Sequence, residues 1–381
     1  MSDGITVTLP DGKELVLDAN ATVFDVASEI GPGLAKAALA GRIEGELVDL
    51  RRPLGADCSL SIVTTKDELG GSIIRHSAEH VMADAVKRLF PSAQVDAGRT
   101  DHSEKFQYDF LVDEPFTPED LERIEKEMNN ILSEGAVFDR EVMTRDQAEE
   151  LFRGLGEELK LSRLGDIPAD AEITIFRHGK FADLCRGPHV HNTKQIGAVK
   201  LTEASGTYFR GDENGPKLQR IYGTAFESKK ALKSYLARLE EAKKRDHRRV
   251  GQDLGLFHMD PLAPGSPFYL PKGMTLYNEL VSFVQDLYPK YGYDEILTPQ
   301  LFRADLFKTS GHYDKFHDDM YWFEGSDVGE ELGVKAMNCP GHCHLFSTGK
   351  RSYRELPVRW AEFSRLHRNE RSGTLNGITR V

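Results

Sequence analysis

The first 64 residues show the alternation of apolar and polar positions that is typical of β-strands, interrupted by one short helix. Apolar residues occupy every second position on both sides of the turn dipeptide Asp11-Gly12: Ile5, Val7, Leu9, Leu15 and Leu17. This pattern predicts a β-hairpin. A helix is predicted over 23–30, ended by Gly31-Pro32, and a last strand over 59–63. We therefore predict a β-grasp module in residues 1–64.

Residues 65–225 alternate between helical and strand patterns. A helix is predicted over 72–90, stopped by Pro91. The next has Thr117 as its N-cap, Pro118 as its first helical residue and Asp120 completing a capping box. Its apolar positions follow the helical period: Leu121, Ile124, Met128 and Ile131. Gly135 ends the helix. From Glu172 onward the pattern predicts strands, with a hairpin tip at His178-Gly179.

The remaining chain predicts a helical connector over 226–250 and a third unit over 251–381. The connector carries a basic run that suits either a solvated helix face or contacts with phosphates: Lys243, Lys244, Arg245, Arg248 and Arg249. In the third unit we predict a long helix over 274–288 and a strand over 293–297, closed by Thr298-Pro299.

Composition narrows the class of protein. Hydrophobic residues make up 39% and charged residues 29% of 381 residues, which predicts a soluble globular protein of two to four domains. No apolar run approaches the length of a membrane span, and we expect no secretory signal. Four cysteines are too few for a disulfide framework, so we expect a cytoplasmic protein. A net charge of −12 argues against non-specific binding to duplexes but leaves room for a local basic stripe.

Histidine and cysteine pairs form the first candidate site. His76 and His80 lie four residues apart on a predicted helix, so they project from one face. That face lies opposite the apolar stripe, where a core histidine is not expected. Cys185 and His189 repeat the spacing on a Gly-Pro turn that follows a strand. Together the four suit zinc or the positioning of a water molecule.

The same segment also matches the zinc-protease pattern H-x-x-E-H. In that alternative His76 and His80 hold zinc and Glu79 is the general base. The pattern is short enough to occur by chance. It explains neither Cys185 and His189 nor the third unit, which favours the other interpretation.

A second candidate site lies near the end of the chain. Arg368 and Glu370 are two residues apart, so on a strand both would face the same side. Such a pair suits a nucleotide, with guanidinium on phosphate and carboxylate on an adenine amino group, although a surface ion pair is the alternative. The ligand types nearby are too crowded for one ion to use them all: Cys339, His342, Cys343 and His344.

Several motifs in order resemble the threonyl-tRNA synthetase family of class II aminoacyl-tRNA synthetases. Residues 1–64 resemble its TGS domain, and residues 291–299 its motif 1. Its editing domain is matched by the stretches His76-Ser-Ala-Glu-His80, Asp183-Leu-Cys185-Arg-Gly-Pro-His189, Gly206-Thr-Tyr-Phe-Arg-Gly-Asp212 and Leu218-Gln-Arg-Ile-Tyr-Gly-Thr224. Met337-Asn-Cys-Pro-Gly-His342 resembles the stretch with the first catalytic zinc ligand, and residues 367–381 resemble motif 2.

This resemblance implies an α+β multidomain protein: a β-grasp TGS domain (1–64), an α+β editing domain (65–225), the connector (226–250) and the start of an antiparallel-sheet class II aminoacylation domain (251–381). It implies ATP-dependent attachment of threonine to tRNA(Thr), with magnesium and a zinc ion held in part by Cys339, and hydrolytic editing of Ser-tRNA(Thr). The partners implied are tRNA(Thr), threonine and ATP, with no membrane, and a homodimer is expected for the full-length family member.

The resemblance also implies roles for individual residues. Editing would use His76, His80, Cys185 and His189, assisted by Lys160 and Asp183. Arg368 would bind the α-phosphate, Glu370 the adenine, and Met337 and Cys339 the amino acid.

The family's two other zinc ligands and its motif 3 would lie beyond Val381. We therefore expect an N-terminal portion in which the editing half is complete and the aminoacylation half is not, with no useful formation of threonyl-adenylate. The alternative is a stand-alone deacylase that edits Ser-tRNA(Thr) in trans.

Overall fold

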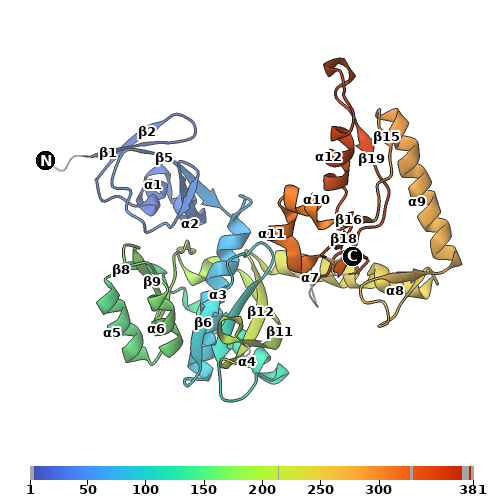
Figure 1. Cartoon of the computed structure of the whole chain (residues 1–381). Helices are drawn as coiled ribbons and strands as arrows, with labels where there is room; N and C mark the ends of the chain where they lie inside the picture. The colour runs from blue at the N-terminus through green and yellow to red at the C-terminus, as the bar shows by residue number, and fades with distance from the viewer. Residues whose placement is uncertain (1–3, 213, 327–328, 371–376, 379–381) are drawn as a thin grey trace. The chain divides into compact units, whose positions relative to one another are not determined.

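The computed structural model describes residues 4–212, 214–326, 329–370 and 377–378. The chain divides into two compact units, Met1–Arg238 and Leu239–Val381 (Figure 1). The division falls inside helix α7 (Lys229–Lys244), within the stretch predicted as a connector. Every helix in the described part of the chain is too short or too polar to span a bilayer.

The N-terminal module of unit 1 is the predicted β-grasp arrangement. Its five strands run in the order β2-β1-β5-β3-β4, with β1 parallel to β5 and the other pairs antiparallel. Their bounds are β1 Ile5–Thr8, β2 Glu14–Leu17, β3 Ala38–Ile43, β4 Glu46–Val48 and β5 Cys58–Thr64. Helix α1 (Val23–Ile30) packs its buried Val23 and Val26 into the sheet's core, and α2 (Pro32–Ala37) follows it.

The second part of unit 1 is built on a four-stranded antiparallel sheet in the order β11-β12-β7-β6. The strands are β6 Gln94–Gly98, β7 Phe106–Leu111, β11 Ala198–Tyr208 and β12 Lys217–Phe226. Helix α3 (Gly70–Leu89) packs on this sheet and α4 (Pro118–Glu134) packs beside it. Helix α4 has the predicted Thr117–Asp120 capping box, and Gly135 ends it with a φ of 71°.

A smaller three-stranded sheet, in the order β10-β9-β8, completes unit 1. Its strands are β8 Asp139–Met143, β9 Ile173–His178 and β10 Phe181–Leu184, and helices α5 (Arg145–Leu155) and α6 (Glu158–Gly165) share its core. Gly179 forms the predicted hairpin tip with a φ of 57°, a backbone conformation that favours glycine. This hairpin ends directly before the segment that carries Cys185.

Helix α3 is enclosed on more than one side, so the face opposite its apolar stripe is buried as well. Ile74 and Val81 on the apolar stripe are 1% and 0% exposed, but Glu79 and His80 are also only 2% and 3% exposed. The helix lies between the large sheet and the segment that follows β10, so its polar face is buried against other polar groups. A buried polar face must be hydrogen-bonded, and these bonds build the candidate site.

Unit 2 contains several short sheets and one long helix. It includes α8 (His247–Asp253), the hairpin β13–β14 (Phe257–Met259, Pro267–Tyr269) and α9 (Pro271–Lys290). A three-stranded antiparallel sheet has the order β16-β18-β17: Leu301–Arg303, Glu331–Val334 and Trp322–Glu324. The remaining helices of unit 2 are α10 (Ala304–Thr309), α11 (His312–Phe316) and α12 (Cys339–Ser347). Single 3-10 turns lie at 193–195 and 209–211 in unit 1 and at 317–319 and 353–355 in unit 2.

The strand predicted over 293–297 is shorter than expected. Only β15 (Asp294–Glu295) pairs, in parallel, with β19 (Trp360–Ala361). The Ile296 amide still donates to the Ala361 carbonyl, but the Thr298 amide donates to the Glu362 carboxylate at 2.9 Å. A side chain thus replaces the next backbone partner and the ladder stops.

The basic run of the connector is exposed, and most of its members make ion pairs with nearby acidic side chains. Lys243 pairs with Glu240, Arg245 with Glu241, and Arg248 with Asp246. Exposed pairs of this kind are typical of a solvated helix face. They favour that alternative over a stripe of phosphate contacts.

Candidate functional site

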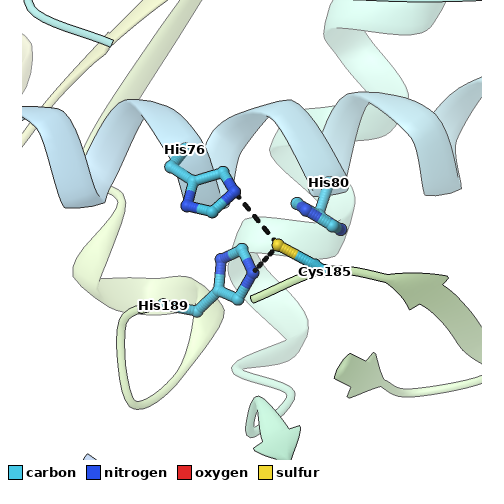
Figure 2. Close-up of side chains that lie close together, drawn as sticks. All are labelled: His76, His80, Cys185 and His189. Carbon is cyan, nitrogen blue, oxygen red and sulfur yellow. Dashed lines mark hydrogen bonds between the residues drawn. The ribbon is translucent and has the colours of Figure 1, made fainter. Parts of the chain in front are cut away.

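Helix α3 and the segment after β10 bring the four predicted ligand-type residues together. Their potential ligand atoms all lie within 4.8 Å of one another: His76, His80, Cys185 and His189. Figure 2 shows the two histidines of α3 one turn apart, facing Cys185 and His189 across the site. The Cys185 Sγ lies 3.2 Å from the His76 Nε2 and 3.3 Å from the His189 Nε2. Among the described residues this is the one such cluster of three or more.

Each imidazole of the cluster is oriented by a contact at its Nδ1. The His76 Nδ1 donates to the Pro188 carbonyl at 3.3 Å, and the His80 Nδ1 lies 3.2 Å from the Asp183 carboxylate. The His189 Nδ1 lies 3.3 Å from the Ser77 hydroxyl, which gives its own proton to the Ile73 carbonyl and must therefore accept. With the proton on Nδ1, all three rings keep an unprotonated Nε2 for the site.

Burial keeps these groups uncharged. It is the main reason why the pKa of His76 lies below 6.5 and those of His80 and His189 lie well below it. Burial likewise raises the pKa of the Cys185 thiol to about 12. The cluster therefore presents three neutral imidazole acceptors and one thiol, and the single thiol proton can satisfy only one of the three acceptors.

This donor set fits two kinds of occupant. Imidazole nitrogens and a cysteine sulfur are the ligands that zinc prefers, and a second partner on the far nitrogen is the usual arrangement for a metal-binding histidine. The same inward lone pairs also suit a water molecule that donates its protons. Both possibilities predicted from the sequence are consistent with the geometry.

A second group of polar side chains supports the cluster. The Asp183 carboxylate lies 2.5 Å from the Lys160 Nζ and accepts a hydrogen bond from the Tyr108 hydroxyl. The Lys160 Nζ also donates to the Tyr108 oxygen at 2.7 Å. All three residues are at most 3% exposed. Because Asp183 also holds His80, it connects the cluster to Lys160; an assisting role of the two residues in editing stays a prediction.

A cavity of about 590 Å³ adjoins this group, and Lys160, Asp183 and Phe181 form part of its wall. Its remaining lining comes from the C-terminal part of α3, from Val95 of β6, from Glu134 at the end of α4, from α5, from Glu157 and from the β9–β10 hairpin. A cavity of this size can accept a small polar group such as an aminoacyl moiety.

The position of Glu79 disfavours the zinc-protease alternative. Its carboxylate lies 2.7 Å from the His102 Nε2, and it accepts backbone hydrogen bonds from Arg99 and Gln107. Burial raises the pKa of Glu79 to about 8. A general base for metal-bound water must face the open side of the ion, whereas Glu79 is committed to this internal pair.

Three residues of this network had no detectable signal in the sequence. Tyr108 lies within a strand, and His102 in the loop before it, so neither shares a spacing with the cluster. Ser77 lies between the two histidines in the sequence, but its contacts with His189 and Val190 form only through the tertiary fold.

In unit 2 the predicted nucleotide residues line one cavity. Arg368, Glu370 and Met337 are part of the wall of a space of about 360 Å³. The strand predicted for Arg368 and Glu370 is absent, because residues 362–370 have no continuous partner: the His367 amide donates to Lys335 and the Asn369 amide to Asp319. The pair faces the cavity through this irregular backbone. Residues 371–376 and 379–381 of the resemblance to motif 2 lie outside the described residues.

Cys339 lies apart from this cavity. It begins helix α12, is exposed, and lines another cavity with Cys343 and His344. His342 is committed to the Glu362 carboxylate at 2.8 Å. The described residues around Cys339 provide no set of three ligand atoms, so the zinc site that the resemblance implies at Cys339 stays a prediction.

Three family models match the chain: the TGS domain over residues 5–64, the Threonyl and Alanyl tRNA synthetase second additional domain over 173–222, and the tRNA synthetase class II core domain (G, H, P, S and T) over 321–381. The second of these includes Cys185 and His189.

The chain is also similar to curated proteins named threonine–tRNA ligase. The one from Marinobacter nauticus is 49% identical over 98% of this chain, and the one from Hahella chejuensis is 48% identical over the same share. The chain spans 58% of the length of each of these relatives. Among solved structures, the RNA binding domain of threonyl-tRNA synthetase from Cryptosporidium parvum Iowa II is 49% identical over 36% of this chain and 34% of that chain, with a TM-score of 0.34.

Proposed function

We propose that this chain, a homologue of the threonine–tRNA ligases, hydrolyses Ser-tRNA(Thr) at the cluster formed by His76, His80, Cys185 and His189. The observation that supports this most directly is the set of three inward Nε2 lone pairs beside a cavity that Lys160 and Asp183 line. Two members of the cluster, Cys185 and His189, lie in the part of the chain that matches the second additional domain.

The substrate follows from the chemistry of threonine selection. Serine lacks only one methyl group of threonine, and one methyl in a pocket is worth about 1–3 kcal/mol, or roughly 10–200-fold in selection. Accurate translation requires more than this, and a second site that removes serine from tRNA(Thr) supplies it. The reverse error, valine for threonine, needs no hydrolysis, because a metal that ligates the hydroxyl of threonine leaves valine with an unmet coordination position.

The proposed reaction is hydrolysis of an ester. A water oxygen forms a bond to the seryl carbonyl carbon, and the bond from that carbon to the ribose oxygen breaks. The neutral His80 Nε2, oriented through Nδ1 by Asp183, takes the proton of the water and returns it to the ribose oxygen. The other members of the cluster hold the water and the terminal ribose, and the Lys160 ammonium faces the substrate. A divalent cation bound there would lower the pKa of the water.

This proposal predicts selective deacylation. The purified chain is expected to hydrolyse Ser-tRNA(Thr) at least about tenfold faster than Thr-tRNA(Thr), because the extra methyl must be excluded from the site. Release of labelled amino acid from each ester measures it, at enzyme concentrations high enough to saturate the tRNA. Equal hydrolysis of both esters, or of neither, would contradict the proposal.

We also propose that the protein takes part in the ligase reaction, in which threonine and ATP with magnesium form threonyl-adenylate and then charge tRNA(Thr). The cavity lined by Arg368, Glu370 and Met337 supports this, since a guanidinium and a carboxylate on one cavity suit the α-phosphate and the adenine amino group. The same proposal includes that the protein forms a homodimer and that it is located in the cytoplasm. We assign no step to zinc at Cys339.

The second site predicts a specific loss in an exchange assay. In any preparation that catalyses threonine-dependent exchange of pyrophosphate into ATP, Arg368→Ala is expected to lower the rate by about 100-fold, because the phosphate charge loses its counter-charge in the transition state. Arg365→Ala, an exposed neighbour of the same type, is the control. Deacylation with no useful exchange is the result expected of the 381-residue chain itself, and robust exchange by it would contradict that expectation.

A further inference from the structure

A carboxylate from the β-grasp module reaches the backbone of the catalytic cluster. Asp49 follows strand β4 directly and is 6% exposed. Its Oδ2 accepts a hydrogen bond of 2.9 Å from the backbone N–H of His189, which lies 140 residues further along the chain. Among the hydrogen bonds of the described residues, it is the one that connects the β-grasp module to a member of the cluster.

The segment that Asp49 holds carries two of the four cluster residues. Cys185 and His189 lie at its two ends, and between them the Gly187 N–H donates to the Cys185 Sγ at 3.3 Å. A side chain on Gly187 would meet the Phe176 ring at 2.7 Å and the Asp49 carboxylate at 3.4 Å, so the backbone passes directly over this carboxylate. The segment is therefore fixed by its own thiol on one side and by Asp49 on the other.

The two backbone amides at the end of this segment are held by different elements. The His189 N–H donates to Asp49, and the next one, of Val190, donates to the Ser77 hydroxyl of α3 at 3.0 Å. The same hydroxyl fixes the His189 ring through its Nδ1. The direction of the His189 Nε2 thus depends on a backbone position that Asp49 and Ser77 determine together.

The carboxylate has two acceptor oxygens, and both are used. Oδ2 serves His189, while Oδ1 accepts the Arg51 N–H at 2.8 Å and holds the turn in which Asp49 lies. An asparagine of the same shape has only one acceptor oxygen, so its NH₂ group would face one of the two N–H donors. The site therefore requires a carboxylate.

Other contacts dock the module onto the same segment further along the chain. The His191 ring stacks on Phe24 with centroids 4.2 Å apart, and the Gln195 amide donates to the carbonyls of Lys36 and Ala38. These contacts can hold the module in place without Asp49. Loss of the Asp49 carboxylate should therefore release the cluster segment while leaving the module attached.

We propose that Asp49 is a positioning residue for the deacylation site, through which the β-grasp module holds Cys185 and His189 in their active arrangement. This inference rests on the proposed deacylase function. It gives the module a role in catalysis in addition to any role in binding.

The test is Asp49→Asn in the full chain. The turnover rate of Ser-tRNA(Thr) hydrolysis under saturating conditions is expected to fall roughly 10–100-fold, the usual cost of losing a contact that orients a reactive side chain, with KM changed by less than about twofold. Amide hydrogen exchange in residues 185–190 should become faster, while exchange in β1 and β2 stays unchanged. Asp57→Asn is the matched control, because Asp57 accepts the Thr6 amide at 2.7 Å within the module.

The outcomes separate the two proposals. A wild-type chain that deacylates and an Asp49→Asn variant with the same turnover rate would overturn this inference alone. An equal fall in the turnover rate of Asp57→Asn, or a change only in the KM of Asp49→Asn, would overturn it as well. An inactive wild-type chain would overturn the deacylase function and this inference with it. Should Asp49→Asn not fold, Asp49→Ser, which is smaller and keeps one acceptor oxygen, replaces it with the same expectations.

Discussion

Changing His76 and Cys185 together to alanine is expected to lower the rate of Ser-tRNA(Thr) hydrolysis by about 10²–10⁴-fold, the range lost when positioned proton-transfer groups are removed. The pair lies at the centre of the site, with the Cys185 Sγ 3.2 Å from the His76 Nε2. Without them, only His80 and His189 remain to hold the bound water molecule or ion. The measurement is the release of serine from Ser-tRNA(Thr) in a single turnover at saturating enzyme.

The fold should survive this double change. His76 and Cys185 both keep some exposure to solvent. The double change removes packing contacts, but it also removes the repulsion between lone pairs that point at one another. The thermal midpoint is the control for folding. The variant with Cys58→Ala and His258→Ala changes the same residue types away from the site and should keep full activity. A double variant that is folded and still active would show that the cluster does not perform the reaction.

The second large effect is on stability, at the buried pair of Lys160 and Asp183. Asp183→Asn is expected to lower the free energy of unfolding by about 3–5 kcal/mol, because it leaves the Lys160 ammonium buried without its counter-charge. The side chains are 4% and 1% exposed and their charged atoms are 2.5 Å apart. Denaturant unfolding measures the change.

Removing both charges should restore most of this stability. In the variant Lys160→Met with Asp183→Asn, no buried charge is left unpaired, so the expected loss is about 1–2 kcal/mol relative to wild type. Deacylation should stay low in both variants, because His80 has lost the carboxylate that orients it. Glu240→Gln removes an exposed pair and should change stability by less than about 0.5 kcal/mol. Equal stability losses in the single and double variants would contradict the charge argument.

Much of the secondary structure was determined by local sequence. The Thr117–Asp120 capping box and Gly135 bound helix α4 as predicted, and Gly31-Pro32 ended the first helix at Ile30. These signals act within a few residues, where the backbone N–H groups of a helix start and the left-handed turn at its end depend on adjacent side chains. Local rules therefore sufficed for them.

Predictions that needed a partner segment were less accurate. The strand over 293–297 shortened to Asp294–Glu295, and Arg368 and Glu370 lie on irregular backbone. A strand exists only where another strand accepts its hydrogen bonds, and the residues themselves do not reveal where that partner ends. Both side chains nevertheless line one cavity.

For the candidate site, the sequence determined the members and the tertiary structure determined their chemistry. The repeated four-residue spacing was enough to select His76, His80, Cys185 and His189, because on a helix it places two side chains on one face. It could not show that Asp183, Pro188 and Ser77 hold the three Nδ1 atoms, or that Asp49 holds the backbone of His189. Ser77, Asp183 and Pro188 lie in the motif stretches themselves, but each holds a histidine from the other stretch, which for Ser77 lies 112 residues away, and Asp49 lies 140 residues from His189. Hydrogen bonds between such segments form only when burial brings them together, so the protonation and orientation of the site were decided by the packing of α3 against the segment after β10.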